Sequence, residues 1–193
     1  MKRQLSLRQY REIDLTAFAI MLLISEVFIR MAIRWFPNEI YTVSVAGAVT
    51  AIVMMRWSGY AGIHAALAGL IYCFLSHGTG KQYLIYVVGN LLSLAALLVF
   101  KVWDKETVRK DSTRTVIFAV CVQVFMQVGR GLVALVLGSS PMSCLGFLTT
   151  DALSGVFTVV VVWIARRLDG IFEDQKHYLL RIHTKGEEKG GSQ

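Results

Sequence analysis

The sequence predicts an all-α integral membrane protein with six transmembrane helices and with cytoplasmic N- and C-termini. The chain has 193 residues, of which 55% are hydrophobic and 17% are charged, whereas ordinary soluble domains are about 25% charged. Its mean hydropathy is +0.55. The apolar runs are continuous rather than alternating, which favours helices over the strands of a membrane barrel. This composition excludes disordered chains, coiled coils and ordinary soluble folds.

Six apolar runs follow one another along the chain, separated by short polar segments. Their lengths of 16–23 residues lie close to the roughly 20 mainly apolar residues that a membrane-spanning helix needs. In chain order, the predicted spans are residues 14–36, 40–55, 59–75, 83–102, 115–137 and 143–165. They form a predicted six-helix transmembrane domain over residues 1–167. Residues 168–193 are expected to form a cytoplasmic amphipathic helix and a solvated tail, with one apolar face made of Leu168, Ile171, Phe172, Leu179 and Ile182.

The basic residues predict the orientation. Of the 20 Lys and Arg residues, Arg34 and Lys81 fall in predicted outer loops, Arg30 and Arg130 fall within spans, and the other 16 fall on inner segments. An excess of Lys and Arg marks the cytoplasmic side of a membrane protein. Topology therefore accounts for the formal net charge of +7, and we expect the lipid bilayer as the environment and no nucleic-acid partner.

Several polar residues in the spans share one predicted depth. Counting along the helices places Glu26, Arg30, Asn90, Arg130 and Asp151 in the outer half of the membrane. Ionisable groups within spans are costly and commonly functional. Gln127 lies one turn from Arg130 on the same helix. We therefore predict a substrate-binding site, open to the outside, formed by Glu26, Arg30, Asn90, Gln127, Arg130 and Asp151.

A purely structural role is the alternative for these residues. Glu26 and Arg30 stand at i and i+4, the spacing of an ion pair within one helix. Arg130 and Asp151 could neutralise each other and hold the fifth helix to the sixth. A plain hydrogen-bonding role between helices is the corresponding alternative for Gln127.

Aromatic and small residues each have two interpretations. The aromatic residues near the outer ends, Trp35, Tyr41, Tyr83 and Tyr86, favour an interfacial belt, with stacking on a flat ligand ring as the alternative. Small residues recur every four positions at Ala61, Ala65 and Gly69, and again at Gly47 and Ala51. Such faces let helices approach closely, either within the protein or against another membrane protein.

The sequence offers no signal for an enzyme, a metal site or a cofactor. The three cysteines are scattered without a C-x-x-C pair, and no second histidine or carboxylate stands at metal-ligand spacing from His64 or His77. The H-E-x-x-H motif of metalloproteases is absent. The serines within spans have no histidine at a matching depth, which argues against a membrane serine protease.

Three stretches carry a family resemblance. They are RWSGYAGIHAALAGLIYCFLSHG, QYLIYVVGNLLSLAALLVF and TTDALSGVFTVVVVWIARRLDGIFEDQKHYLL, which are residues 56–78, 82–100 and 149–180. With the first helix, they make the chain resemble the substrate-binding S component of an energy-coupling-factor (ECF) transporter. The resemblance implies capture of a small vitamin-like solute from outside. It also implies a membrane scaffold subunit and two ABC-type ATPases as partners, in a bacterial plasma membrane.

A second function class is compatible with the size and topology. A small structural or assembly protein of the cell envelope could have six helices and both termini inside. Such a protein would not need four ionisable residues in the outer half of its spans.

For the solute-binding interpretation, the two arginines within the spans, Arg30 and Arg130, would suit a solute with an anionic group such as a carboxylate.

Overall fold

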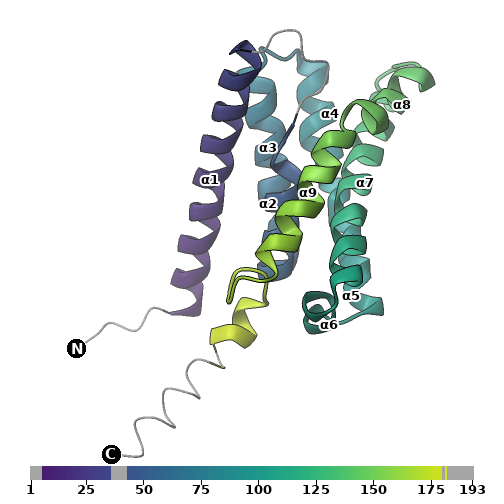
Figure 1. The fold of residues 1–193 in the computed structure, drawn as a ribbon. Coiled ribbons are helices and arrows are strands. Elements are labelled where there is room, and N and C mark those ends of the chain that lie inside the picture. Colours follow the sequence, from purple (N-terminus) through teal and green to yellow (C-terminus); the bar gives the residue numbers. More distant parts are fainter. Residues whose placement is uncertain (1–5, 36–42, 180, 182–193) are drawn as a thin grey trace, which may run out of the picture.

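The computed structural model describes residues 6–35, 43–179 and 181, and this part of the chain is helical, without a strand. Figure 1 shows these helices gathered side by side into a bundle. Five segments are long and apolar enough to cross a membrane: Leu7–Trp35, Ala46–Leu75, Gly80–Val102, Ser112–Val136 and Cys144–Ala165. The elements are α1 (Leu7–Trp35), α2 (Ala46–Trp57), η1 (Ser58–Tyr60), α3 (Ala61–Leu75), α4 (Gly80–Asn90), η2 (Leu91–Leu98), α5 (Val99–Val102), α6 (Lys105–Lys110), α7 (Ser112–Val136), α8 (Pro141–Thr150) and α9 (Ala152–Ala165).

The segment Ala46–Leu75 is a hairpin rather than one straight helix. The start of α2 lies beside Glu26 of α1 and its end lies beside Asp14, so α2 is antiparallel to α1. After a reversal at Ser58, where φ is 54°, α3 runs parallel to α1. The second predicted span, 40–55, is thus represented by α2, whose 12 residues measure about 18 Å at 1.5 Å per residue. Residues 36–42 lie outside the described residues, and six spans remain a prediction.

The sixth predicted span, 143–165, is broken in its N-terminal half. Helix α8 ends at Thr150 and α9 starts at Ala152, with Asp151 between them at φ −101° and ψ 14°. Helix α8 lies along the C-terminal part of α7, where its Cys144 faces Gly131. The break therefore places the Asp151 carboxylate beside α7, within the bundle rather than at its surface.

The core surrounds α2, whose residues are all buried. The small faces predicted from the sequence lie inside the protein, because Ala61, Ala65 and Ala51 are fully buried and the place of a Gly69 side chain is occupied by the Tyr86 carbonyl group of α4. The internal-packing interpretation of these faces is confirmed. Close approach of this kind is how helices associate without a hydrophobic driving force in lipid.

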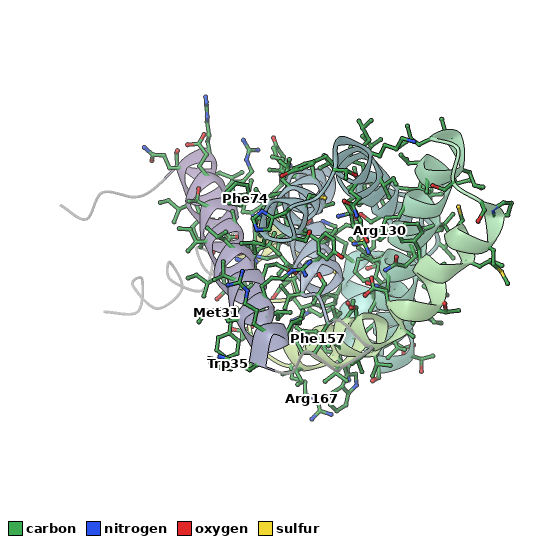
Figure 2. The ribbon with its side chains drawn as sticks, turned by 90° about the horizontal axis from the view of Figure 1, so that it is seen from above. Met31, Trp35, Phe74, Arg130, Phe157 and Arg167 are labelled. Carbon is green, nitrogen blue, oxygen red and sulfur yellow. The ribbon has the colours of Figure 1, made fainter. Side chains whose placement is uncertain are left out.

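The outside of the bundle is apolar. On α1, Ile24 and Phe28 are 63% and 65% exposed, and Figure 2 shows Met31 and Trp35 on the outer side of α1 while Arg130 lies between the helices. A soluble protein does not leave so much apolar surface in water. The fold is that of an all-α protein embedded in a membrane.

The opposite end of the bundle from Trp35 is closed by residues 166–175. These residues form turns, and helix starts again only at Gln175, so the amphipathic helix expected from residue 168 is not continuous. Phe172 is fully buried against Phe118, and Tyr10 donates a hydrogen bond of 3.1 Å to Gln175. The start of α1 and the C-terminal segment therefore lie at the same end.

Ion pairs at this end predict a sensitivity to acid. Burial opposes ionisation of the Asp174 carboxyl, but the hydrogen bond and charge of Lys105, together with hydrogen bonds from the Lys176 and His177 backbone, outweigh it and lower the pKa of Asp174. The hydrogen bond from Arg109 likewise lowers the pKa of Glu106. A lowered folded-state pKa contributes stability that is complete above the unfolded carboxyl value of about 4. This stability is lost as the pH falls through the folded value.

We therefore expect the unfolding temperature of the detergent-solubilised protein to fall as the pH is lowered from 5 to 3. Asp174→Asn should flatten this fall, because its side chain cannot titrate. Asp169→Asn is the matched control, since Asp169 is 78% exposed in its pair with Arg181 and exposed pairs contribute little. An identical pH dependence in the wild type and Asp174→Asn would contradict the assignment.

Candidate functional site

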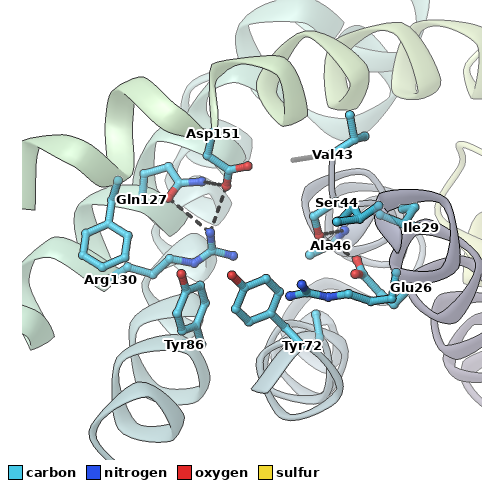
Figure 3. A pocket seen from close by; sticks show the side chains of 14 residues that line it. Glu26, Ile29, Val43, Ser44, Ala46, Tyr72, Tyr86, Gln127, Arg130 and Asp151 are labelled. Carbon is cyan, nitrogen blue, oxygen red and sulfur yellow. Dashed lines mark hydrogen bonds and ion pairs between the residues drawn. The ribbon is translucent and has the colours of Figure 1, made fainter. Parts of the chain in front are cut away.

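A polar cavity of about 100 Å³ lies between α1, α3, α4, α7, α8 and the segment that leads into α2. Figure 3 shows side chains from these elements pointing toward one another around it. Five of the six predicted site residues line the cavity: Glu26, Arg30, Gln127, Arg130 and Asp151. The structure therefore brings these five side chains together around one space, and their role in substrate binding stays a prediction.

Arg130 is the centre of a buried hydrogen-bond network. Its Nε donates to Asn90 Oδ1 at 2.7 Å, and its Nη1 donates to Gln127 Oε1 at 3.2 Å and to Asp151 Oδ2 at 2.9 Å. Gln127 Nε2 also donates to Asp151 Oδ2. The side chains of Arg130 and Asp151 are only 8% and 14% exposed, and they form the ion pair between α7 and the sixth span that was the structural alternative for these residues.

Asn90 supports the cavity without lining it. The residue is fully buried, and its Nδ2 donates to the Ala65 carbonyl oxygen of α3 at 2.9 Å while its Oδ1 accepts from Arg130. Asn90 therefore fixes the Arg130 guanidinium relative to α3 and α4. Asn90 therefore contacts Arg130 from outside the cavity, whereas the sequence predicted that Asn90 would contact the substrate directly.

Glu26 holds the start of α2. Its Oε1 accepts hydrogen bonds from Ser44 Oγ at 2.7 Å and from the Val45 backbone N–H at 3.2 Å. The first N–H groups of a helix lack partners within the helix and favour a nearby negative charge. Because Glu26 supplies that charge from α1, α2 can begin inside the bundle, at the depth of the cavity.

Arg30 does not pair with Glu26, although the i, i+4 spacing allows it. No ion pair within 4.0 Å involves Arg30 in the described part of the chain. Its guanidinium lies 4.4 Å above the centroid of the Tyr72 ring. Within the same residues, the Arg30 Nη2 atom is buried and has no hydrogen-bond partner. The intrahelical pair that was the alternative for these two residues is therefore not formed.

Two tyrosines connect the two arginines. The rings of Tyr72 and Tyr86 stack with centroids 4.4 Å apart, and the Arg130 guanidinium lies 4.8 Å from the Tyr86 centroid. The order Arg30, Tyr72, Tyr86, Arg130 runs through α1, α3, α4 and α7. Cation–π contacts of this kind are worth about 0.5–2 kcal/mol each, most where water is excluded.

The aromatic belt predicted from the sequence included Tyr86, and this was wrong because Tyr86 faces the cavity. Tyr72 and Ser44 also line the cavity, and neither was predicted from the sequence to do so. A signal for both tyrosines was available: Tyr72 follows Gly69 by three residues on the small buried face of α3, and Tyr86 precedes Asn90 by four. Trp35 is exposed at the end of α1, and Tyr41 lies outside the described residues.

No group of three His, Cys, Asp or Glu side chains within residues 6–35, 43–179 and 181 is arranged to hold a metal ion. Comparison with known proteins found no family model, no curated protein and no solved structure that matches the chain. The fold and the cavity define a helical membrane protein with a polar cavity between its helices.

Proposed function

We propose that the protein is a membrane solute-binding subunit of the ECF S-component kind. It captures a small water-soluble solute from the outer side of the membrane. ATPases on other chains supply the energy for uptake. The observation that carries this proposal is the cavity in which Arg30 holds a buried, unpartnered donor atom next to a network of polar side chains.

Packing alone accounts poorly for this arrangement. Arg130 and Asp151 neutralise each other and satisfy most of their hydrogen bonds, so they could serve only to join α7 to the α8–α9 break. Arg30 adds a charge without an ion-pair partner among the described residues. A buried donor without a partner costs about 1–3 kcal/mol. A solute that accepts from Arg30 would recover that free energy.

The basic end of the bundle supports the orientation. Arg56, Lys105, Arg109 and Arg166 all lie near residues 166–175 or near α6, and a basic end faces the cytoplasm under the positive-inside rule. The cavity near Arg30 and Arg130 is then in the outer half. The start of α2 and the break between α8 and α9 both adjoin the cavity, and discontinuous helices of this kind commonly form solute sites in transporters.

Partner identification tests the proposal. The tagged protein, purified in mild detergent from its native membrane, is expected to bring with it a second multi-pass subunit and two ABC-type ATPases, identified by mass spectrometry. Adding ATP and magnesium should stimulate phosphate release by the recovered complex. The control is a tagged multi-pass protein of similar size from the same membrane, which should recover neither ATPase.

Recovery of the protein alone, or together with envelope-assembly proteins, would contradict the ECF assignment. Combined with a failure to bind any small molecule, that result would favour the structural or assembly role. The polar cavity would then serve to hold α1, α3, α4 and α7 together.

A further inference from the structure

The formal charges around the cavity balance. Arg30 and Arg130 contribute two positive charges, and Glu26 and Asp151 contribute two negative charges. Placing a net charge in a low-dielectric interior is expensive. An anionic or a cationic solute would leave the filled cavity charged. A solute with both charges, and with no net charge, would leave it neutral.

The free donor of the cavity lies on α1. Arg30 Nη2 is buried and makes no hydrogen bond in the described part of the protein, whereas Arg130 is engaged by Asn90, Gln127 and Asp151. A guanidinium presents its N–H groups as a planar fork that matches a carboxylate. Arg30, rather than Arg130, is therefore the cation available to a solute carboxylate.

The free acceptors lie on the two carboxylates of the cavity, Glu26 and Asp151. Both hydrogen bonds to Glu26 end on Oε1, and both bonds to Asp151 end on Oδ2. Among the described residues no donor reaches Glu26 Oε2 or Asp151 Oδ1. Figure 3 shows the second oxygen of Asp151 turned away from the dashed bonds. An ammonium group has three donors and no acceptor, which suits two such carboxylate oxygens.

The space available limits the size of the solute. The cavity volume of about 100 Å³ is below the ~300 Å³ at which drug-sized sites begin. The stacked rings of Tyr72 and Tyr86 bound it on one side. A compact solute of a few heavy atoms fits this volume without movement of the helices.

We propose that the cavity binds a compact zwitterion, an amine and a carboxylate on one small carbon skeleton. The carboxylate lies on Arg30, and the ammonium lies against Glu26 Oε2 and Asp151 Oδ1. This inference rests on the proposed solute-binding function and names the class of its substrate.

The test is a binding screen on the purified full-length protein in lipid nanodiscs, read by thermal shift and then by calorimetry. The zwitterionic probes are the common amino acids, β-alanine and 4-aminobutyrate. The other probes are acetate, lactate and nicotinate as anions, choline as a cation, and glucose and uridine as neutral solutes. The zwitterion that binds best is then compared with its amide, which has lost the carboxylate charge, and with its N-acetyl derivative, which has lost the ammonium.

The expected result is that a zwitterion binds and that both derivatives bind at least about tenfold more weakly, the effect of losing one charge-assisted hydrogen bond. Either derivative binding as tightly as its parent would overturn the inference. Binding of anions, cations or neutral solutes alone would overturn the inference while the solute-binding function stands. Binding of none of the probe classes would overturn both.

Two variants test which residue binds the carboxylate of the solute and which binds its ammonium group. Arg30→Gln is expected to weaken zwitterion binding by about tenfold or more, while Arg34→Gln, which changes an exposed arginine one turn further along α1, should leave it unchanged. Glu26→Gln keeps an oxygen that can accept from Ser44 and Val45 but removes a negative charge. It should therefore raise the affinity for the N-acetyl derivative relative to the zwitterion, a ratio that a change in folding alone would not alter. An unchanged ratio, together with unchanged binding in Arg30→Gln, would contradict the assignment.

Discussion

Arg56→Ala is expected to lower the free energy of unfolding by about 3–5 kcal/mol, the cost of leaving one member of a buried ion pair alone. Arg56 donates to both oxygens of Asp14, with Nε at 2.8 Å and Nη2 at 2.7 Å. It also donates to the carbonyl oxygens of Gly170 and Ile171. The side chains of Arg56 and Asp14 are only 5% and 13% exposed. The variant therefore removes the contact that joins α1, α2 and the C-terminal segment.

Thermal or denaturant unfolding in detergent measures the loss, and the rate of trypsin cleavage at Arg166, Arg167 and Lys176 reports release of the C-terminal segment. Arg56→Lys should be intermediate, because lysine keeps the charge but not the two-pronged geometry. Arg8→Ala is the control: its pair with Glu12 is 81% and 57% exposed, and an exposed pair is worth about 0–1 kcal/mol. Equal losses for Arg56→Ala and Arg8→Ala would show that the buried pair does not hold this end.

The common level of the polar residues along the bundle could be predicted, because it depends only on counting along helices. A rise of 1.5 Å per residue and one orientation placed Glu26, Arg30, Arg130 and Asp151 in one layer, and the structure brings them around one cavity. Several basic residues also cluster at one end of the bundle, an arrangement that the predicted topology requires. Such features depend on position along a single helix, and they do not change with the packing of the neighbouring helices.

The partner of each polar group could not be predicted, because it depends on rotation of the helices about their axes. Glu26 and Arg30 have the spacing of a pair, yet Glu26 turns to the start of α2 and Arg30 turns to Tyr72. Packing against α3 sets that rotation, and the small residues of α3 allow the approach. For the same reason Tyr86, which has the composition of an interfacial residue, faces inward.

The breaks in the helices were also missed. The sequence is mainly apolar on both sides of Asp151, so hydropathy alone predicts one span over 143–165. The structure interrupts it because Asp151 turns toward Gln127 and Arg130. Likewise, α2 starts at Ala46 because Glu26 accepts a hydrogen bond from the N–H of Val45, directly before the helix, at the level of the cavity. Tertiary hydrogen bonds decide both boundaries, and a single sequence does not show them.

Gly89→Ala is expected to displace α7 from α4 and to disturb the cavity through the backbone of Arg130. A Cβ atom at residue 89 would lie 2.6 Å from the Arg130 Cα and 2.7 Å from its backbone nitrogen, and backbone atoms cannot rotate out of the way. The opposing residue on α7 is Gly129, where a Cβ would lie 2.0 Å from the Gly89 carbonyl oxygen. Overpacking of a buried contact typically costs about 1–3 kcal/mol.

For Gly89→Ala we expect a loss of unfolding free energy at the upper end of that range, because neither helix can relieve the clash by rotating a side chain. Solute binding should fall with it, since Arg130 would move relative to Asn90 and Asp151. Gly80→Ala is the matched control, in the same helix α4 and with nothing within 4 Å of the added methyl group. Unfolding temperature and solute affinity are measured for both variants. If Gly89→Ala and Gly80→Ala give the same unfolding temperature and the same solute affinity, then the contact between α4 and α7 does not hold Arg130 in place. The position of the guanidinium then depends on Asn90 and Asp151 alone.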